Sequence, residues 1–260
     1  MTDWSGRDYA KVSGLQRAMA RDAVSALTFA GDEHVLDIGC GDGFVTHAIA
    51  GLLTGGSGPA CVVGVDPSPR MIAAAHGIPR RGPSGPWFVR ADARGLPFAA
   101  RFDVVVSFNA LHWVPEQARA LGQIALVARP GARVLIQQVC ASPRTSLESV
   151  AMSLTEKPAW AASFAGFTAP FVHVHPDTYG ELAAAAGLTV VSLTVTDREW
   201  DFGSRDRFAR WCAVGSGAWT DRLEPADRMR FIDEQIRAYE LLAGRPGLFR
   251  FTQLRAQLRN

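Results

Sequence analysis

Short apolar runs alternate with helical patterns along the first half of the chain. The length and content of each run are typical of a buried strand. We expect strands over residues 35–38, 60–66, 87–91, 102–108 and 132–139. Apolar residues at helical spacing predict helices over residues 44–50, 69–77 and 115–127. This alternation predicts an α/β fold, in which a mostly parallel sheet carries helices on both faces.

Different patterns flank this region. Before the first strand, an apolar stripe that includes Leu15, Met19 and Val24 predicts a helix over residues 8–30. After residue 139 the sequence predicts a helix over 177–186, a sixth strand over 188–195, two helices within 204–243 and a closing edge strand over 248–258. We interpret residues 143–173 and 202–245, which are rich in aromatic residues, as a helical cap over the strand ends. The whole chain, residues 1–260, is expected to form a single domain.

Composition excludes several classes of protein. The 260 residues are 48% hydrophobic and carry a formal net charge of +2, which allows a sizeable core and does not indicate nucleic-acid binding. No apolar run approaches the ~18 residues of a membrane span, and no signal peptide is evident, so we expect a cytoplasmic protein without a membrane partner. Oligomeric state stays open. We interpret a mild arginine cluster as solvated loop charge: Arg80, Arg81, Arg90, Arg94 and Arg101.

Glycine dominates the turn that follows the first strand. Gly39, Gly41 and Gly43 occupy alternate positions, where the absence of a Cβ permits a sharp turn and a close ligand approach. A strand, a glycine turn and a helix start place a ligand against free backbone N–H groups. Asp66, about 20 residues further on at the end of the second strand, is placed to grip the hydroxyls of a ribose.

The glycine spacing and two further acids make a specific resemblance. The spacing is Gly-x-Gly-x-Gly, preceded by Asp37, whereas the dinucleotide fingerprint is Gly-x-Gly-x-x-Gly, which disfavours a NAD-binding oxidoreductase. Asp92 ends the third strand. These residues resemble the motifs of class I S-adenosylmethionine (SAM)-dependent methyltransferases, in which Asp66 would bind the ribose and Asp92 the adenine amino group.

The resemblance implies a Rossmann-like seven-stranded sheet with an antiparallel last strand. It also implies SAM as cofactor and S-adenosylhomocysteine as product. Cys40 lies in the glycine turn, and we interpret its side chain as a packing group and not as a nucleophile. The residues that the resemblance places at the cofactor are Asp37, Gly39, Cys40, Gly41, Gly43, Asp66, Pro67, Met71, Asp92, Ala93, Asn109 and Ala110.

The exit of the fourth strand points to a small-molecule acceptor. The segment Leu111–Val114 resembles the aromatic signature of the trans-aconitate and juvenile hormone acid methyltransferases. Trp113 matches a tryptophan that positions a carboxylate, and Gln16 aligns with a glutamine that contacts it; Tyr9 would add a hydroxyl. For Gln16 the alternative is a surface residue. The Asn/Asp-Pro-Pro-aromatic and Pro-Cys motifs of DNA methyltransferases are absent from the sequence.

Three functions remain open at this point. A carboxylate acceptor has a pKa of about 4 and needs no general base, which favours methylation of a small, apolar acid on its carboxylate oxygen. An O- or C-methyltransferase acting on a phenol, alcohol or carbon acid would use His112 as base. The chain could also be an inactive SAM-binding partner subunit. His173 and His175 are expected to introduce a helix, and scattered cysteines give no metal site.

Overall fold

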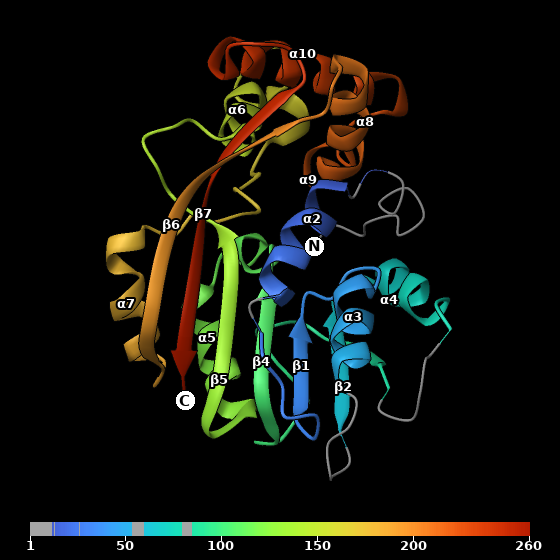
Figure 1. The fold of residues 1–260 in the computed structure, drawn as a ribbon. Helices are drawn as coiled ribbons and strands as arrows, with labels where there is room; N and C mark the ends of the chain where they lie inside the picture. The colour runs from blue at the N-terminus through green and yellow to red at the C-terminus, as the bar shows by residue number, and fades with distance from the viewer. Residues whose placement is uncertain (1–11, 13, 26, 54–59, 80–84) are drawn as a thin grey trace.

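The protein is described from a computed structural model that covers residues 12, 14–25, 27–53, 60–79 and 85–260. Its centre is a seven-stranded sheet in the order β3-β2-β1-β4-β5-β7-β6 (Figure 1). Strands β1 to β5 pair in parallel, whereas β7 runs antiparallel to both of its neighbours. The predicted α/β fold is therefore confirmed. The strands are β1 (His34–Ile38), β2 (Cys61–Asp66), β3 (Trp87–Arg90), β4 (Phe102–Phe108), β5 (Ala128–Val139), β6 (Thr189–Asp201) and β7 (Leu248–Arg259).

The predicted position of the last strand is wrong. β7 does not lie at the edge but between β5 and β6, with most of its residues buried, and β6 is the exposed edge strand. β6 continues to Asp201, beyond the predicted end at Val195, because it pairs with β7 up to Leu248. An antiparallel neighbour on each side satisfies the backbone of β7, which sequence alone does not specify.

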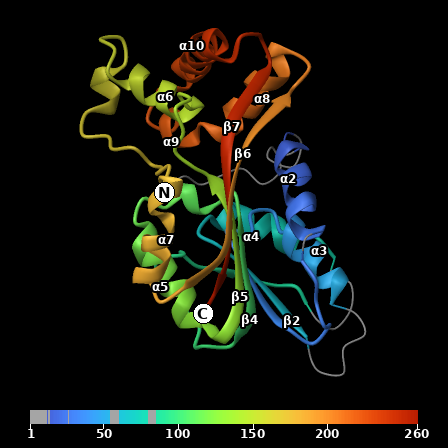
Figure 2. The same cartoon turned by 60° about the vertical axis from the view of Figure 1, so that its left-hand side comes forward.

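Alternate side chains of the central strands pack into two separate hydrophobic cores, one on each face of the sheet. Leu36 and Val105 pack with helices α5 (Gln117–Val127) and α7 (Pro176–Ala185) on one face. Val35 and Val104 pack with α2 (Gly14–Ser25) and α3 (Phe44–Leu52) on the other. Figure 2 shows the sheet nearly edge-on between these two layers. Burial on both faces explains why these strands are continuous apolar runs.

Two helices have boundaries that differ from the prediction. α2 ends at Ser25 and not at Ala30, because the strand β5 binds the chain beyond it: the Arg133 guanidinium donates to the Thr28 carbonyl at 2.7 Å. α5 begins at Gln117 and not at Pro115, after a 3-10 turn, η1 (Leu111–Trp113). The strand β5 begins at Ala128, four residues before the predicted start at Ala132, because Ala128 pairs with Phe102 of β4. The remaining predicted elements lie close to their expected positions, including α4 (Pro69–His76), whose first turn is capped by the Ser68 hydroxyl.

A second group of helices lies beyond the carboxyl ends of the central strands (Figure 1). α8, α9 and α10 are inserted between β6 and β7, and α6 and η2 follow β5. Their aromatic side chains pack mainly on one another and on β7, for example Phe208 with Tyr239 and Phe249. None of the described helices is both long and apolar enough to cross a bilayer. The bounds are α6 (Leu147–Thr155), η2 (Ala161–Phe164), α8 (Arg205–Gly215), α9 (Gly217–Thr220) and α10 (Pro225–Ala243).

Candidate cofactor and acceptor site

A cavity of about 700 Å³ lies where the carboxyl ends of the strands meet α2 and the second group of helices. Most of the residues that the sequence singled out line it. Asp37, Cys40 and Gly43 do not belong to the lining, and Tyr9 lies outside the described residues. The predicted site residues that the fold brings together here are Gln16, Gly39, Gly41, Asp66, Pro67, Met71, Asp92, Ala93, Asn109, Ala110, His112 and Trp113.

The three glycines of the turn have different physical roles. A Cβ on Gly39 would lie 2.1 Å from the Cβ of Ala110, and one on Gly43 would lie 2.8 Å from the Phe88 ring, so both positions require glycine for packing. Gly41 has a φ of 54°, and its Cβ position meets no protein atom within 4 Å. Because Gly41 also lines the cavity, the turn leaves space there for a ligand to approach the backbone.

Asp37 supports the turn from beneath. It is 2% exposed, and the Thr46 hydroxyl donates to its Oδ2 at 2.7 Å. Desolvation raises the pKa of Asp37 to about 7, an effect that the Thr46 hydrogen bond partly opposes. Cys40 packs against Phe88, and burial raises the pKa of its thiol, which keeps it neutral and agrees with a packing role.

The Asp66 carboxylate is fixed by two backbone donors. Its Oδ2 accepts from the Gly41 N–H at 3.1 Å and its Oδ1 from the Ser68 N–H at 2.9 Å. The glycine turn is held to the same strand, because the Gly39 N–H donates to the Val65 carbonyl at 2.8 Å. These contacts hold the Asp66 carboxylate beside the glycine turn, at the wall of the cavity.

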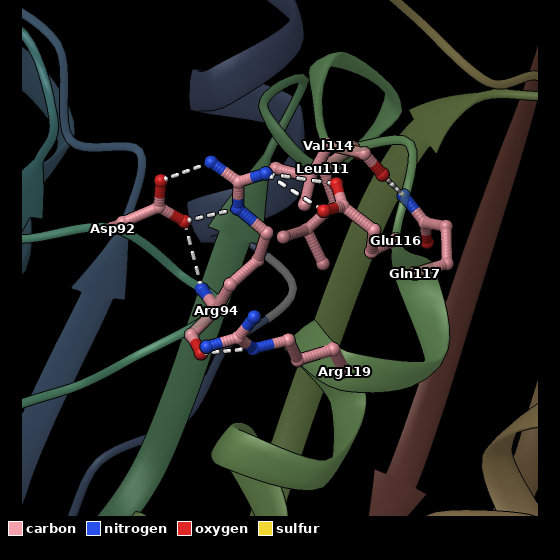
Figure 3. Close-up of polar contacts among 7 residues, drawn as sticks. All are labelled: Asp92, Arg94, Leu111, Val114, Glu116, Gln117 and Arg119. Carbon is pink, nitrogen blue, oxygen red and sulfur yellow. Dashed lines mark hydrogen bonds and ion pairs between the residues drawn. The ribbon is translucent and has the colours of Figure 1, made fainter.

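Asp92 is held by a residue that the sequence analysis assigned to the solvent. Arg94 donates to both carboxylate oxygens of Asp92, at 2.9 Å from Nε and 2.7 Å from Nη2, and its Nη1 reaches Glu116 at 2.8 Å (Figure 3). Arg119 in turn donates to the Arg94 carbonyl at 2.9 Å. The side-chain hydrogen bond from Arg94 is the main cause that lowers the pKa of Asp92. The interpretation of Arg94 as solvated loop charge is therefore wrong; the Asp-x-Arg spacing was the available signal.

The N-terminal helix contributes Gln16 to the far half of the cavity. Gln16 is half-buried and lines the cavity, so it is not the surface residue of the alternative interpretation. The Trp211 indole N–H, from α8, donates to its Oε1 at 3.3 Å. This contact, which the sequence did not reveal, uses one of the two acceptor sites of the amide oxygen, and the amide N–H₂ supplies the donors of Gln16.

His112 and Trp113 lie on the 3-10 turn after β4. His112 is 4% exposed, and its Nδ1 has no hydrogen-bond partner among the described residues. Burial, with a smaller contribution from His173 at 6.3 Å between ring centroids, lowers the pKa of His112 to about 3. Trp113 packs edge-on against Trp219 of α9, with ring centroids 6.2 Å apart, and forms part of the cavity wall.

The two other histidines differ in their surroundings. His175 caps α7, accepting from the Asp177 N–H at 3.4 Å, as expected for a helix-entry residue. His173 is buried instead beside Glu148, with 3.9 Å between Nε2 and Oε2. No set of three or more potential metal ligands occurs among the residues for which the structure gives positions.

The strand order, the glycine turn and the two strand-end acids define a Rossmann-like α/β fold with a cavity at the carboxyl edge of its sheet, where open α/β sheets bind their ligands. The family described as "Methyltransferase domain" matches residues 35–131. Residues 35–131 are therefore similar to a methyltransferase domain, and the chain resembles the trans-aconitate methyltransferases.

Three comparisons show how far the similarity extends. A trans-aconitate 2-methyltransferase of Azoarcus sp. (strain BH72) is 31% identical in sequence to this chain. The alignment covers 64% of this chain and 61% of the relative. The O-methyltransferase cnsE of Penicillium expansum is 36% identical, and the alignment covers 52% of this chain and 47% of that relative. An N-methyltransferase of Haemonchus contortus, solved with S-adenosylhomocysteine, shares the fold with a TM-score of 0.58 at 15% identity, over 96% of this chain and 56% of that one. The chain spans less than two thirds of each of these proteins.

Proposed function

We propose that the chain transfers the methyl group of SAM to the carboxylate oxygen of a small, mostly apolar acid. The observation that carries this choice is the state of His112, the only candidate general base that the sequence offered. A buried imidazole whose pKa is lowered to about 3 is neutral and weakly basic. General-base catalysis is most effective when the pKa of the base lies near the working pH. An acceptor that is already ionised avoids this requirement.

The residues present fit SAM. Gly41 leaves open space beside the backbone, Asp66 places a carboxylate in the cavity wall where a ribose would lie, and Arg94 fixes the carboxylate of Asp92, which would face the nucleoside base. SAM supplies a sulfonium methyl group that is electrophilic without further activation. The chain's own task is then to orient the acceptor and to exclude water.

Gln16 and Trp113 are the residues that we assign to the acceptor carboxylate. Both line the cavity, and Trp211 holds the Gln16 oxygen so that its amide N–H₂ can donate. Trp113 offers an indole N–H, which is a donor only. N–H donors suit an acceptor carboxylate, which when ionised can only accept hydrogen bonds. We further propose that α6 and α8–α10 act as the cap that closes the acceptor half of the cavity within a single domain.

One observation favours the alternative acceptor, a phenol, alcohol or carbon acid. The unpartnered Nδ1 of His112 is an acceptor in a residue that lines the cavity, and a hydroxyl could donate to it. Substitution separates the two functions. His112→Asn should leave carboxylate methylation within a few-fold, whereas loss of a working base lowers kcat by roughly 10²-fold or more.

The first experiment is transfer of labelled methyl from SAM to a panel of acids and phenols, followed by alkali treatment of the product. Label released as methanol identifies a methyl ester and supports the proposal. Label that survives alkali identifies an ether, amine or carbon product and overturns it, moving His112 to the centre of the reaction. A chain that binds SAM but labels no acceptor in the panel would contradict the proposed acceptor class and leave the partner-subunit hypothesis.

A further inference from the structure

Glu148 places a carboxylate in the acceptor half of the cavity. It lies in the first turn of α6, is 9% exposed, and lines both the main cavity and a smaller neighbouring one. None of the described residues donates a hydrogen bond to its carboxylate. Its nearest basic group is the His173 Nε2 at 3.9 Å, beyond hydrogen-bond distance. A nearly buried carboxylate without donors favours a ligand that supplies one.

The surrounding charges do not compensate Glu148. Burial lowers the pKa of His173, an effect that Glu148 partly opposes, so burial disfavours the charged form of this imidazole. Arg144 and Arg250 line the smaller cavity, but each pairs with an acid on β6, Asp197 at 3.5 Å and Glu199 at 3.4 Å respectively. The carboxylate of Glu148 therefore contributes a negative potential to the wall of the acceptor half.

The remaining cations of the main cavity are also engaged. Among its described lining residues there are five acids and two arginines. Arg94 is held by Asp92 and Glu116 at the cofactor end. Arg222 is exposed and lies over the Phe167 ring, 4.7 Å from the centroid. An acceptor with several carboxylates would thus have one exposed arginine, Arg222, to pair with, and it would be repelled by the buried carboxylate of Glu148.

We propose that Glu148 determines acceptor specificity: it receives a hydroxyl or ammonium group at the end of the acceptor remote from the methylated carboxylate, and it excludes a second carboxylate there. This inference rests on the proposed carboxyl methylation. It separates the chain from an enzyme for tricarboxylates, although a trans-aconitate methyltransferase is among its relatives. Like charges brought together in a desolvated site repel each other strongly enough to set specificity.

The test compares straight-chain acids of equal length that differ only at the far end: methyl, hydroxyl, ammonium or a second carboxylate. kcat/KM is measured for the unchanged protein and for Glu148→Gln, which keeps the size of the side chain. Glu156→Gln is the matched control, because Glu156 is an exposed residue at the end of the same helix. In the unchanged protein the hydroxyl or ammonium acid should be preferred, and the dicarboxylate should be poorest.

Glu148→Gln should raise the rate for the dicarboxylate relative to the methyl-terminated acid by roughly tenfold or more. A larger loss for the ammonium acid than for the hydroxyl acid identifies the natural donor as a cation; equal, smaller losses identify a hydroxyl. The control should keep the original order. Unchanged ratios in Glu148→Gln would overturn the inference even if all the acids are methylated.

A binding measurement separates this result from failure of the proposed function. Quenching of tryptophan fluorescence by the same acids, with S-adenosylhomocysteine present, reports occupancy because Trp113, Trp211 and Trp219 line the cavity. If no acid is methylated but Glu148→Gln still changes the order of binding, the methylation proposal fails and the assignment of Glu148 stands. If no acid binds, both are overturned.

Discussion

Arg94 grips Asp92 through both terminal oxygens and links it to Glu116 at the start of α5. The side chain of Asp92 is 28% exposed, so without this clamp the carboxylate could rotate into solvent. Hydrogen bonds to charged groups contribute about 1.5–3 kcal/mol each in favourable cases. Under the proposed function, Arg94 is a positioning residue for the end of the cavity that would hold the nucleoside of SAM.

Arg94→Gln should weaken SAM binding by about tenfold, because Asp92 loses its fixed orientation. The acceptor KM should change little, since Gln16 and Trp113 lie on other elements. Calorimetric titration with SAM measures the first effect and steady-state kinetics the second. Arg101→Gln is the control, an exposed arginine outside the cavity lining. Equal SAM affinity in both variants would contradict the positioning role.

Asp66 and the acceptor residues should separate into two functional groups. Asp66→Ala should reduce SAM binding beyond detection, because it removes the ribose acceptor and the Gly41 contact together. Gln16→Ala and Trp113→Ala should raise acceptor KM and lower kcat while SAM affinity stays nearly unchanged. Equilibrium dialysis with labelled SAM, run beside the kinetics, distinguishes these outcomes. A parallel loss of SAM affinity in all three variants would show that the roles are wrongly divided.

Trp211→Phe tests how Gln16 is oriented. Phenylalanine keeps an aromatic ring against Phe249 but cannot donate to the Gln16 oxygen. We expect acceptor KM to rise about threefold to tenfold, the scale of one neutral hydrogen bond, with SAM affinity unchanged. In the Gln16→Ala background the same substitution should have little further effect. Additive losses in the double variant would mean that Trp211 acts independently of Gln16.

Asp37 should make the stability of the fold depend on pH. Its pKa is about 7 in the folded protein, above the 3.8 of an aspartate in an unfolded chain, so between these two values the folded state holds a proton that the unfolded state has released. The contribution of Asp37 to the free energy of unfolding is therefore largest below a pH of 3.8 and is lost as the pH rises to about 7. The loss is up to about 4 kcal/mol. Urea unfolding at several pH values measures this trend.

Asp37→Asn is the matched variant for that measurement, because it keeps an acceptor for the Thr46 hydroxyl and cannot ionise. Its stability should fall less than that of the unchanged protein between about pH 4 and pH 8. Parallel curves for the two proteins would show that Asp37 does not titrate in this range.

The local pattern of the sequence determined most of the sheet and the positions of the nucleoside-binding residues. Val35 and Leu36 are apolar on both faces of a strand, and Gly39 and Asp66 are required where two neighbouring strands end. Parallel strands bring their carboxyl ends to one edge, so these residues meet once the fold class is known. The Ser68 cap and the helix after it are local in the same sense.

Only the tertiary structure decided the contacts between distant segments. β7 enters between β5 and β6 because antiparallel pairing with both neighbours satisfies its backbone, and no local signal specifies that place. Gln16 and Trp211 are 195 positions apart in the sequence and meet only because α8 packs beside α2. The burial of His112 and Glu148 depends on how the second group of helices packs. Burial lowers the pKa of His112, and it leaves the Glu148 carboxylate without a hydrogen-bond donor among the described residues.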